Sequence, residues 1–149
     1  MAAGAAGDVA IELNTVAGGG FFLLSHLIAI ALYCRNPRAR PARTQKVAAA
    51  ALLAGVPIAA WLLTLDLLAV VYAVALAAMA ASAWLSRFSR YRVGIGALLF
   101  VASDLLIFAR LGGALPQSFT TWFVWPLYYA GQLLICTGVI HSARTVERS

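Results

Sequence analysis

Five apolar runs, each long enough to cross a lipid bilayer, constrain this chain more than any other feature of its sequence. A membrane-spanning α-helix needs about 20 consecutive apolar residues. Four short gaps separate the five runs: three are rich in Arg, Pro or Gly, and one is the single residue Asp66. The pattern predicts an all-α fold, a polytopic membrane helix bundle that forms one domain over residues 1–149. The expected spans are about Val16–Cys34, Val47–Leu65, Leu67–Leu85, Val93–Arg110 and Thr121–Ile140.

The composition indicates an integral membrane protein whose partner is the lipid bilayer. Hydrophobic residues make up 63% of the chain and charged residues 11%, whereas soluble domains carry about 25% charged residues. The net charge of +6 does not point to nucleic acid, because the basic residues lie between apolar runs and form no basic face with interleaved aromatics. Cys34 and Cys136 show no CxxC spacing, so neither a disulfide framework nor a zinc site is expected.

The distribution of the basic residues predicts the topology. The gap 35–46 holds five basic residues, the loop 86–92 holds three arginines and the C-terminal tail is also basic. The gaps 65–66 and 111–120 hold no Lys or Arg. The positive-inside rule then places the basic gaps and the C-terminus in the cytoplasm. Because the chain is rich in alanine and arginine, as proteins of GC-rich bacteria are, we expect the bacterial inner membrane.

Residues 1–15 are apolar but too few to cross a bilayer. Since the first full span begins outside under the predicted topology, we expect these residues to be the second half of a helix that starts in the cytoplasm. Asp8 and Glu12 would share one face of it. A disordered or interfacial N-terminus is the alternative that the pattern leaves open.

Asp104 lies well inside the fourth apolar run. A carboxylic acid at the centre of a spanning helix costs about 2.5–3.5 kcal/mol on insertion scales, and such residues usually face a bundle interior or a wet cavity. We therefore interpret Asp104 as serving ligand, proton or catalytic chemistry. The alternative is a carboxyl group hydrogen-bonded to a neighbouring helix. Asp66, in a tight turn, is interpreted as the N-cap of the following helix.

Polar residues on four segments fall at a similar depth. With a rise of about 1.5 Å per residue, each lies roughly 10–16 Å from the end of its segment that faces outside. They would therefore form one slab in the outer half of the bilayer, which predicts a shared cavity. The residues are Asp8, His26, Asp104, Tyr128, Tyr129 and Gln132.

Two carboxyl groups in such a cavity can divide acid and base roles, which suits hydrolysis of an acid-labile ether. A metal hydrolase wants three or more His or carboxylate ligands. The chain has only His26 and His141, which lie at different depths, so no metal or other cofactor is expected. Ser103 and Asp104 point about 100° apart on one helix, which disfavours a Ser–His–Asp triad, and no GxSxG motif is present.

Several blocks resemble the YhhN-like lysoplasmalogenase family, also known as the transmembrane protein 86 family. The most specific block is Gly96-Ala97-Leu98-Leu99-Phe100-Val101-Ala102-Ser103-Asp104. Before it come Gly7-Asp8 and then Phe22, His26 and Tyr33; after it comes Tyr128-Tyr129-Ala130-Gly131-Gln132. The resemblance covers nearly all of this chain but only part of the family's length. The family's first two helices and the start of the third would lie before Gly7.

The resemblance implies a bundle of about eight helices that hydrolyses the vinyl ether of lysoplasmalogen, a lysophospholipid. The products are a fatty aldehyde and a glycerophospho-alcohol. It implies Asp8 and Asp104 as the catalytic pair, with a supporting group around them that binds substrate or assists. That group consists of His26, Ser103, Tyr129 and Gln132.

Two other functions also fit these residues. A small proton-coupled transporter would use an intramembrane Asp and His as well, although no pair of matching repeats is apparent across the spans. A non-catalytic or degenerate membrane homologue would leave Asp8 and Asp104 dispensable. Consumption of a substrate, as opposed to its movement across a membrane, separates the enzyme from the transporter.

Overall fold

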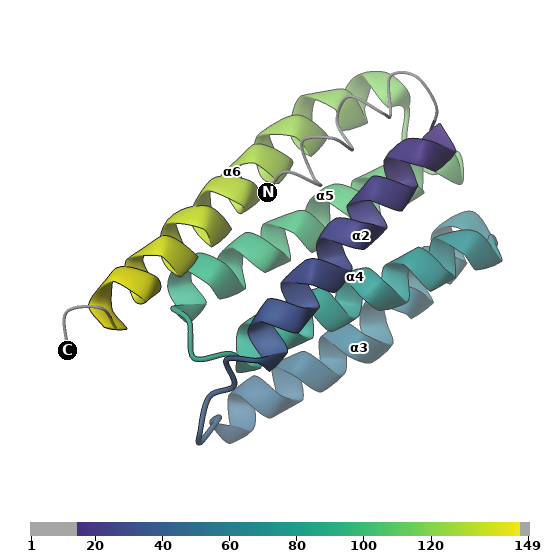
Figure 1. The fold of residues 1–149 in the computed structure, drawn as a ribbon. Coiled ribbons are helices and arrows are strands. Elements are labelled where there is room, and N and C mark those ends of the chain that lie inside the picture. The colour runs from purple at the N-terminus through teal and green to yellow at the C-terminus, as the bar shows by residue number, and fades with distance from the viewer. Residues whose placement is uncertain (1–14, 147–149) are drawn as a thin grey trace.

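A computed structural model describes residues 15–146, with side chains described over 18–142. It contains five α-helices and a short π-helical turn, η1 (Figure 1). The half-span expected over residues 1–15, including Asp8, lies essentially outside the described residues. The elements are α2 (Thr15–Cys34), α3 (Arg43–Thr64), α4 (Leu67–Leu85), η1 (Arg90–Gly94), α5 (Ile95–Leu111) and α6 (Gln117–Val146).

Four helical segments are long and apolar enough to cross a membrane, and a shorter apolar segment, Gly18–Cys34, precedes them. The four are Arg43–Thr64, Leu67–Leu85, Arg90–Leu111 and Gln117–Ser142. Large apolar side chains such as Leu62, Leu68 and Trp122 are more than two-thirds exposed. Exposed apolar surface on this scale is typical of a protein surrounded by lipid. The predicted all-helical membrane bundle is thereby confirmed.

The helices extend beyond the apolar runs at several ends. Helix α3 begins at Arg43 and α6 begins at Gln117, both inside segments expected to be loops. Gln45 explains the first difference, because its side-chain oxygen accepts a hydrogen bond of 2.9 Å from the backbone N–H of Ala42. Apolar runs mark the part of a helix inside lipid, whereas helical hydrogen bonding continues into the interface wherever polar groups can satisfy its ends.

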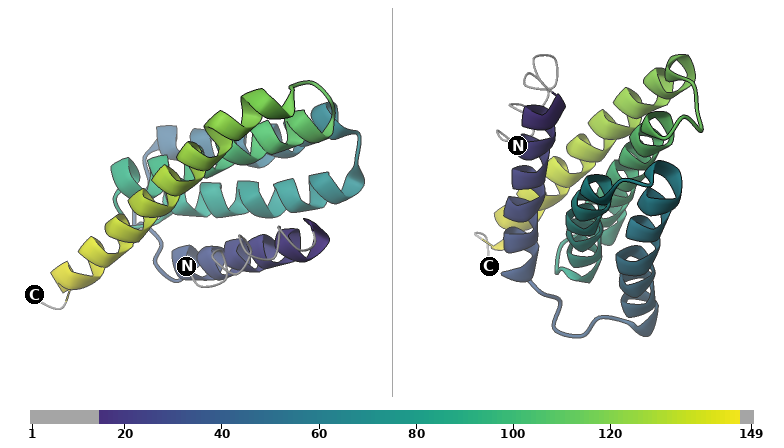
Figure 2. Two further views of the ribbon diagram at one scale, coloured as in Figure 1. Left: turned by 90° about the horizontal axis from the view of Figure 1, so that it is seen from above. Right: turned by 90° about the vertical axis from the view of Figure 1, so that its right-hand side faces the viewer.

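Helices α4 and α5 occupy the middle of the bundle. Helix α2 packs on α4, α6 packs on α5 and η1, and α3 packs against both central helices. In the right-hand view of Figure 2, α2 and α3 lie on opposite sides of the bundle, and α6 crosses it at an angle. The Ala-rich surface of α4 allows the close approach, with Ala73, Ala77 and Ala80 buried in the core.

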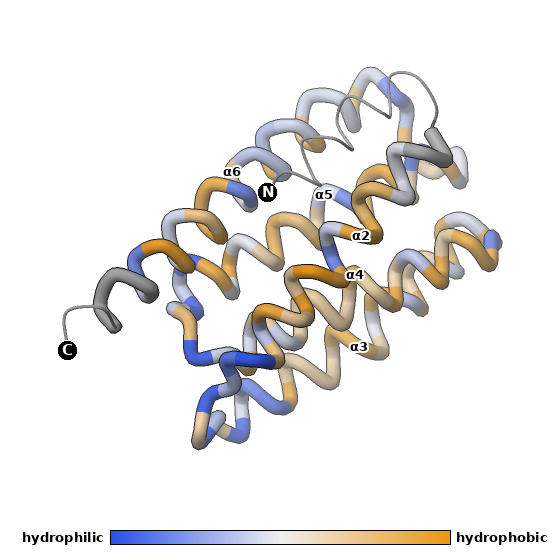
Figure 3. The backbone as a smooth tube through the Cα atoms, viewed as in Figure 1, coloured by the Kyte–Doolittle hydropathy of each residue, from blue (hydrophilic) through white to orange (hydrophobic). Residues whose placement is uncertain are grey.

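The two ends of the bundle differ in hydropathy (Figure 3), and the arginine-rich connections lie at the more hydrophilic end. At one end, which we call the basic end, the connection 35–42 meets the connection 86–89. Two backbone hydrogen bonds join them, Arg38 N–H to the Leu85 carbonyl at 3.0 Å and Arg87 N–H to the Asn36 carbonyl at 2.9 Å. At the opposite end, the Asp66 carboxylate accepts a 2.9 Å hydrogen bond from the Leu68 N–H, which confirms Asp66 as the N-cap of α4.

Two glycines allow α5 and α6 to pack backbone against backbone. A Cβ atom added at Gly96 would lie 2.8 Å from the carbonyl oxygen of Gly131, and one added at Gly131 would lie 2.9 Å from the carbonyl oxygen of Gly96. Both distances are shorter than a carbon–oxygen contact permits. This close approach brings the Asp104-bearing helix next to the helix that carries Tyr128 and Gln132.

We predict that Gly96→Ala lowers the thermal unfolding midpoint of the purified protein in detergent. Overpacking costs about 1–3 kcal/mol, which exceeds the gain of about 1 kcal/mol that alanine brings to a helix interior. Gly55→Ala in α3 is the matched control, since a Cβ there meets nothing within 4 Å, and its midpoint should stay level or rise. Equal midpoints for the two variants would contradict the packing argument.

Candidate active site

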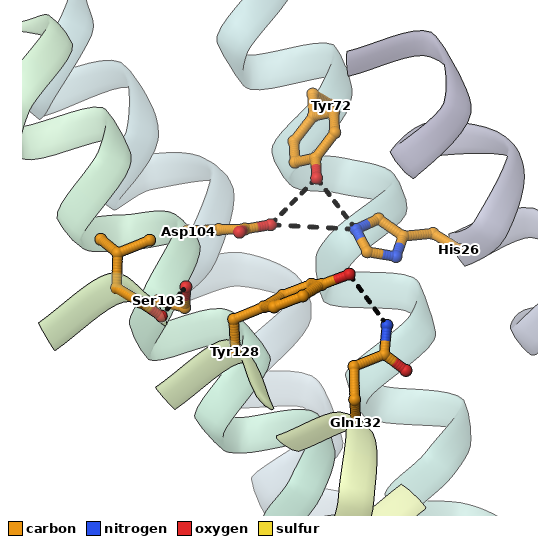
Figure 4. A network of polar contacts seen from close by, with 7 residues as sticks. His26, Tyr72, Ser103, Asp104, Tyr128 and Gln132 are labelled. Carbon is orange, nitrogen blue, oxygen red and sulfur yellow. Dashed lines mark hydrogen bonds and ion pairs between the residues drawn. The ribbon is translucent and has the colours of Figure 1, made fainter. Parts of the chain in front are cut away.

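Three side chains from three helices meet inside the bundle: His26 of α2, Tyr72 of α4 and Asp104 of α5 (Figure 4). The Tyr72 hydroxyl donates a hydrogen bond of 3.0 Å to Oδ2 of Asp104. The His26 Nε2 atom lies 3.2 Å from the same hydroxyl and 3.8 Å from Asp104 Oδ2. The three groups therefore form a closed triangle around one carboxylate oxygen.

The hydrogen-bond capacity of each group fixes the direction of this network. A phenol has one proton, and Tyr72 gives it to the carboxylate. The Tyr72 hydroxyl oxygen then accepts a hydrogen bond from the His26 ring, which requires a proton on Nε2. In a neutral ring Nδ1 is then the basic nitrogen, whereas in the imidazolium both nitrogens carry protons.

Aromatic rings surround the triangle. The His26 ring makes edge contacts with Tyr72 and Phe100, at centroid distances of 5.4 and 5.9 Å. The Tyr72 ring contacts Phe108 at 6.0 Å. His26 and Asp104 are both buried. Because both groups are buried, an electrostatic interaction between the His26 ring and the Asp104 carboxylate is stronger than it would be at a surface.

A second polar pair lies on α6. The Gln132 side chain donates a 3.2 Å hydrogen bond through Nε2 to the Tyr128 hydroxyl. The buried Tyr128 ring packs edge-on against Phe22 of α2 at 5.7 Å and against Phe100 of α5 at 5.1 Å. Tyr128 thus connects the α2 and α6 sides of the bundle, and Gln132 lies one helical turn further toward the basic end.

A cavity of about 330 Å³ adjoins both polar groups. Helices α2 and α6 form its walls, and Met79 and Phe100 of the central helices also line it. Ser25, His26 and Gln132 lie at its polar end. Its other walls are mainly aliphatic, and the residues beyond the polar end are Ile28, Ala29, Leu32, Tyr33, Ile135, Cys136, Val139 and Ile140.

The structure separates the residues predicted from sequence into two groups. His26 and Asp104 come together, and Gln132 shares the cavity with His26. The hydroxyl of Ser103 instead donates to the Val124 carbonyl at 3.1 Å, so it ties α5 to α6. Tyr129 is 57% exposed and stacks on Trp125, on the outside of the bundle.

Asp8 lies outside the described residues, so its position relative to Asp104 stays a prediction. Tyr72 was not among the predicted site residues. The available signal was a lone tyrosine about 8 Å into the Ala-rich helix α4, at a depth close to that estimated for Asp104. Within the part of the chain that the structure describes, no three His, Cys, Asp or Glu side chains gather where a metal ion could bind.

Comparison with known proteins identifies the family. The sequence profile of the YhhN family matches residues 1–139, nearly the whole chain. Searches of curated proteins and of solved structures give no match. The family match agrees with the resemblance carried by the Gly96–Asp104 block and by the residues around His26 and Gln132. The chain belongs to the YhhN family.

Proposed function

We propose that this protein is a membrane hydrolase that cleaves the vinyl ether bond of a lysoplasmalogen. One observation carries the proposal: the His26–Tyr72–Asp104 triangle adjoins a mainly aliphatic cavity with one polar end. The YhhN family includes lysoplasmalogenases, and a lysoplasmalogen combines one aliphatic chain with an acid-labile bond next to its polar head. The cavity offers a matching arrangement of aliphatic and polar surfaces.

The reaction consumes one water molecule. A proton adds to the vinyl carbon farther from the ether oxygen and gives an oxocarbenium ion. Water then adds to the carbon attached to that oxygen and releases a proton, which leaves a hemiacetal. The hemiacetal collapses to a fatty aldehyde and a glycerophospho-alcohol. The protein must therefore supply a proton, stabilise a transient cation and accept a proton back.

We assign these tasks to the triangle. His26, which lines the cavity, delivers the proton through its Nδ1 side and later accepts one from water. Asp104, held by Tyr72, stabilises the imidazolium and adds negative charge near the oxocarbenium ion. Asp8 is proposed as the second carboxylate, which shares the acid and base work. Gln132 is proposed to contact the polar part of the substrate.

The same proposal includes the topology, with the basic end and the C-terminus in the cytoplasm of a bacterial cell. It follows from the positive-inside rule, because Arg35, Arg38, Arg87 and Arg90 lie in or next to the connections of the basic end. The opposite end, with the turn 65–66 and the connection 112–116, would face the periplasm.

We predict that Asp104→Asn lowers the rate of aldehyde release from a lysoplasmalogen by about 10²–10⁴-fold, the usual contribution of a general acid–base group. The amide cannot carry the charge that stabilises an imidazolium. Aldehyde release by the purified protein in detergent gives the rate. Asp66→Asn is the matched control, because asparagine caps a helix as well as aspartate does. Full activity of Asp104→Asn would contradict the assignment.

Tyr72→Phe should lower the same rate by about 10–100-fold and leave the protein folded. The change removes a hydrogen bond to a charged group, worth about 1.5–3 kcal/mol, and each 1.36 kcal/mol corresponds to a tenfold change in rate. Tyr91→Phe, at an exposed tyrosine of the basic end, should have no effect. If Tyr72→Phe matched the wild type, Tyr72 would have no role in holding the carboxylate.

Labelling of Cys34 tests the topology. Cys34 is exposed at the end of α2 beside the basic connection. In a Cys136→Ala background, a membrane-impermeant maleimide should label Cys34 in inside-out vesicles and not in intact spheroplasts. A cysteine introduced at the exposed Ser118, in a chain lacking both native cysteines, should show the reverse pattern. Labelling of Cys34 from outside would invert the proposed orientation.

A further inference from the structure

We infer that the cavity between α2 and α6 holds the hydrocarbon chain of a single-chain lipid, with the chain running from His26 toward the basic end. The inference rests on the proposed function for the position of the cleaved bond at His26. Beyond that position, we infer the direction in which the substrate lies and the residues that limit the length of its chain.

The cavity extends in one direction from the polar triangle. Its lining residues run along α2 from Ser25 to Tyr33 and along α6 from Gln132 to Ile140, about 12 Å on each helix. Both stretches lead from the polar end toward the basic end, where Gly138 meets Arg92 and Val93. In the opposite direction, the Phe22–Tyr128 ring contact bridges α2 and α6 within about one helical turn of His26 and Gln132. Among the described residues, the cavity therefore extends only toward the basic end.

The polar triangle lies closer to one end of the bundle than to the other. Tyr72 lies about 8 Å from the start of α4 but about 20 Å from its end at Leu85. Asp104 lies about 10 Å from the end of α5 but about 21 Å from Arg90, where η1 begins. In a lysoplasmalogen the cleaved bond adjoins the head group, which must stay near a membrane surface. The nearer surface for both residues is the one opposite the basic end.

These two observations are independent and give the same orientation. The chain points toward the basic end, and the head group lies on the side of Phe22 and Tyr128. Leu32, Val139 and Ile140 then surround the far end of the chain and set the length that the cavity accepts. Helices α2 and α6 touch through side chains at the Phe22–Tyr128 contact, while within residues 15–146 their backbones do not approach each other. The chain can therefore enter from the bilayer between them.

Photo-crosslinking on the wild-type protein tests this inference without turnover. The probe is an alkyl-ether lysophosphatidylethanolamine, which lacks the cleavable vinyl ether, with a diazirine at the end of a ten-carbon chain that matches the length of the cavity lining. In lipid nanodiscs, we expect crosslinks on Leu32, Val139 or Ile140, and competition by the same lipid without diazirine. Crosslinks near Phe119–Phe123 would reverse the orientation. Crosslinks confined to lipid-facing residues such as Leu53 and Leu62 would show that the chain does not occupy the cavity. Either result overturns the inference.

Chain-length selectivity is the second test. Ile140→Trp should lower kcat/KM for a ten-carbon lysoplasmalogen relative to a six-carbon one by about tenfold or more, because excluding even one methylene group from a fitted pocket has an effect of that size. Leu133→Trp, at an exposed position on α6 outside the cavity lining, should leave the ratio unchanged. An unchanged ratio for Ile140→Trp in an active protein would contradict the inference.

The two tests separate the failure of this inference from that of the proposed function. If the protein crosslinks at the far end of the cavity but releases no aldehyde, the chain-binding site stands and the hydrolase proposal fails. If the protein releases aldehyde but shows no crosslinks in the cavity, the hydrolase proposal stands and the chain-binding site fails.

Discussion

The carboxylate of Asp104 is the group whose burial the rest of this bundle must accommodate. An ionised carboxylate away from water costs several kcal/mol unless it is paired and hydrogen-bonded. The Tyr72 hydroxyl and the His26 ring meet this requirement from two neighbouring helices. The polar triangle therefore links α2, α4 and α5 at one depth, and any shift of one helix along its axis by a residue would separate the three groups.

The small residues of the bundle make this meeting possible. Alanines along α4 and the Gly96–Gly131 contact bring helix backbones close together, so short side chains such as Asp104 can reach a neighbour. In lipid, close packing and interhelical hydrogen bonds hold helices together because no hydrophobic effect drives their association. Ser103 contributes one such bond to α6, which explains a buried hydroxyl beside Asp104 without giving it a chemical role.

Within residues 15–146, the sequence was sufficient for the number and approximate bounds of the helices, since a bilayer imposes length and composition on each span. The depths estimated from the helical rise also placed His26, Asp104 and Gln132 in one region. The sequence did not resolve which side of a helix faces inward. Tyr128 and Tyr129 are adjacent, about 100° apart on α6, yet one is buried and the other exposed. Lipid-facing side chains are as apolar as core ones, so no amphipathic pattern distinguishes the two faces. Tyr72 was missed for the same reason.

The position of the triangle also constrains what kind of substrate the site can serve. It lies nearer one end of the bundle than the other on both α4 and α5, and it lines the cavity only through His26. A water-soluble molecule would need a polar route to the triangle, whereas the cavity beyond His26 is largely aliphatic. A molecule with a reactive bond between a polar head and a long chain satisfies both conditions at once. The charge that such a reaction develops would then form beside His26, where Asp104 can stabilise it in surroundings that exclude most water.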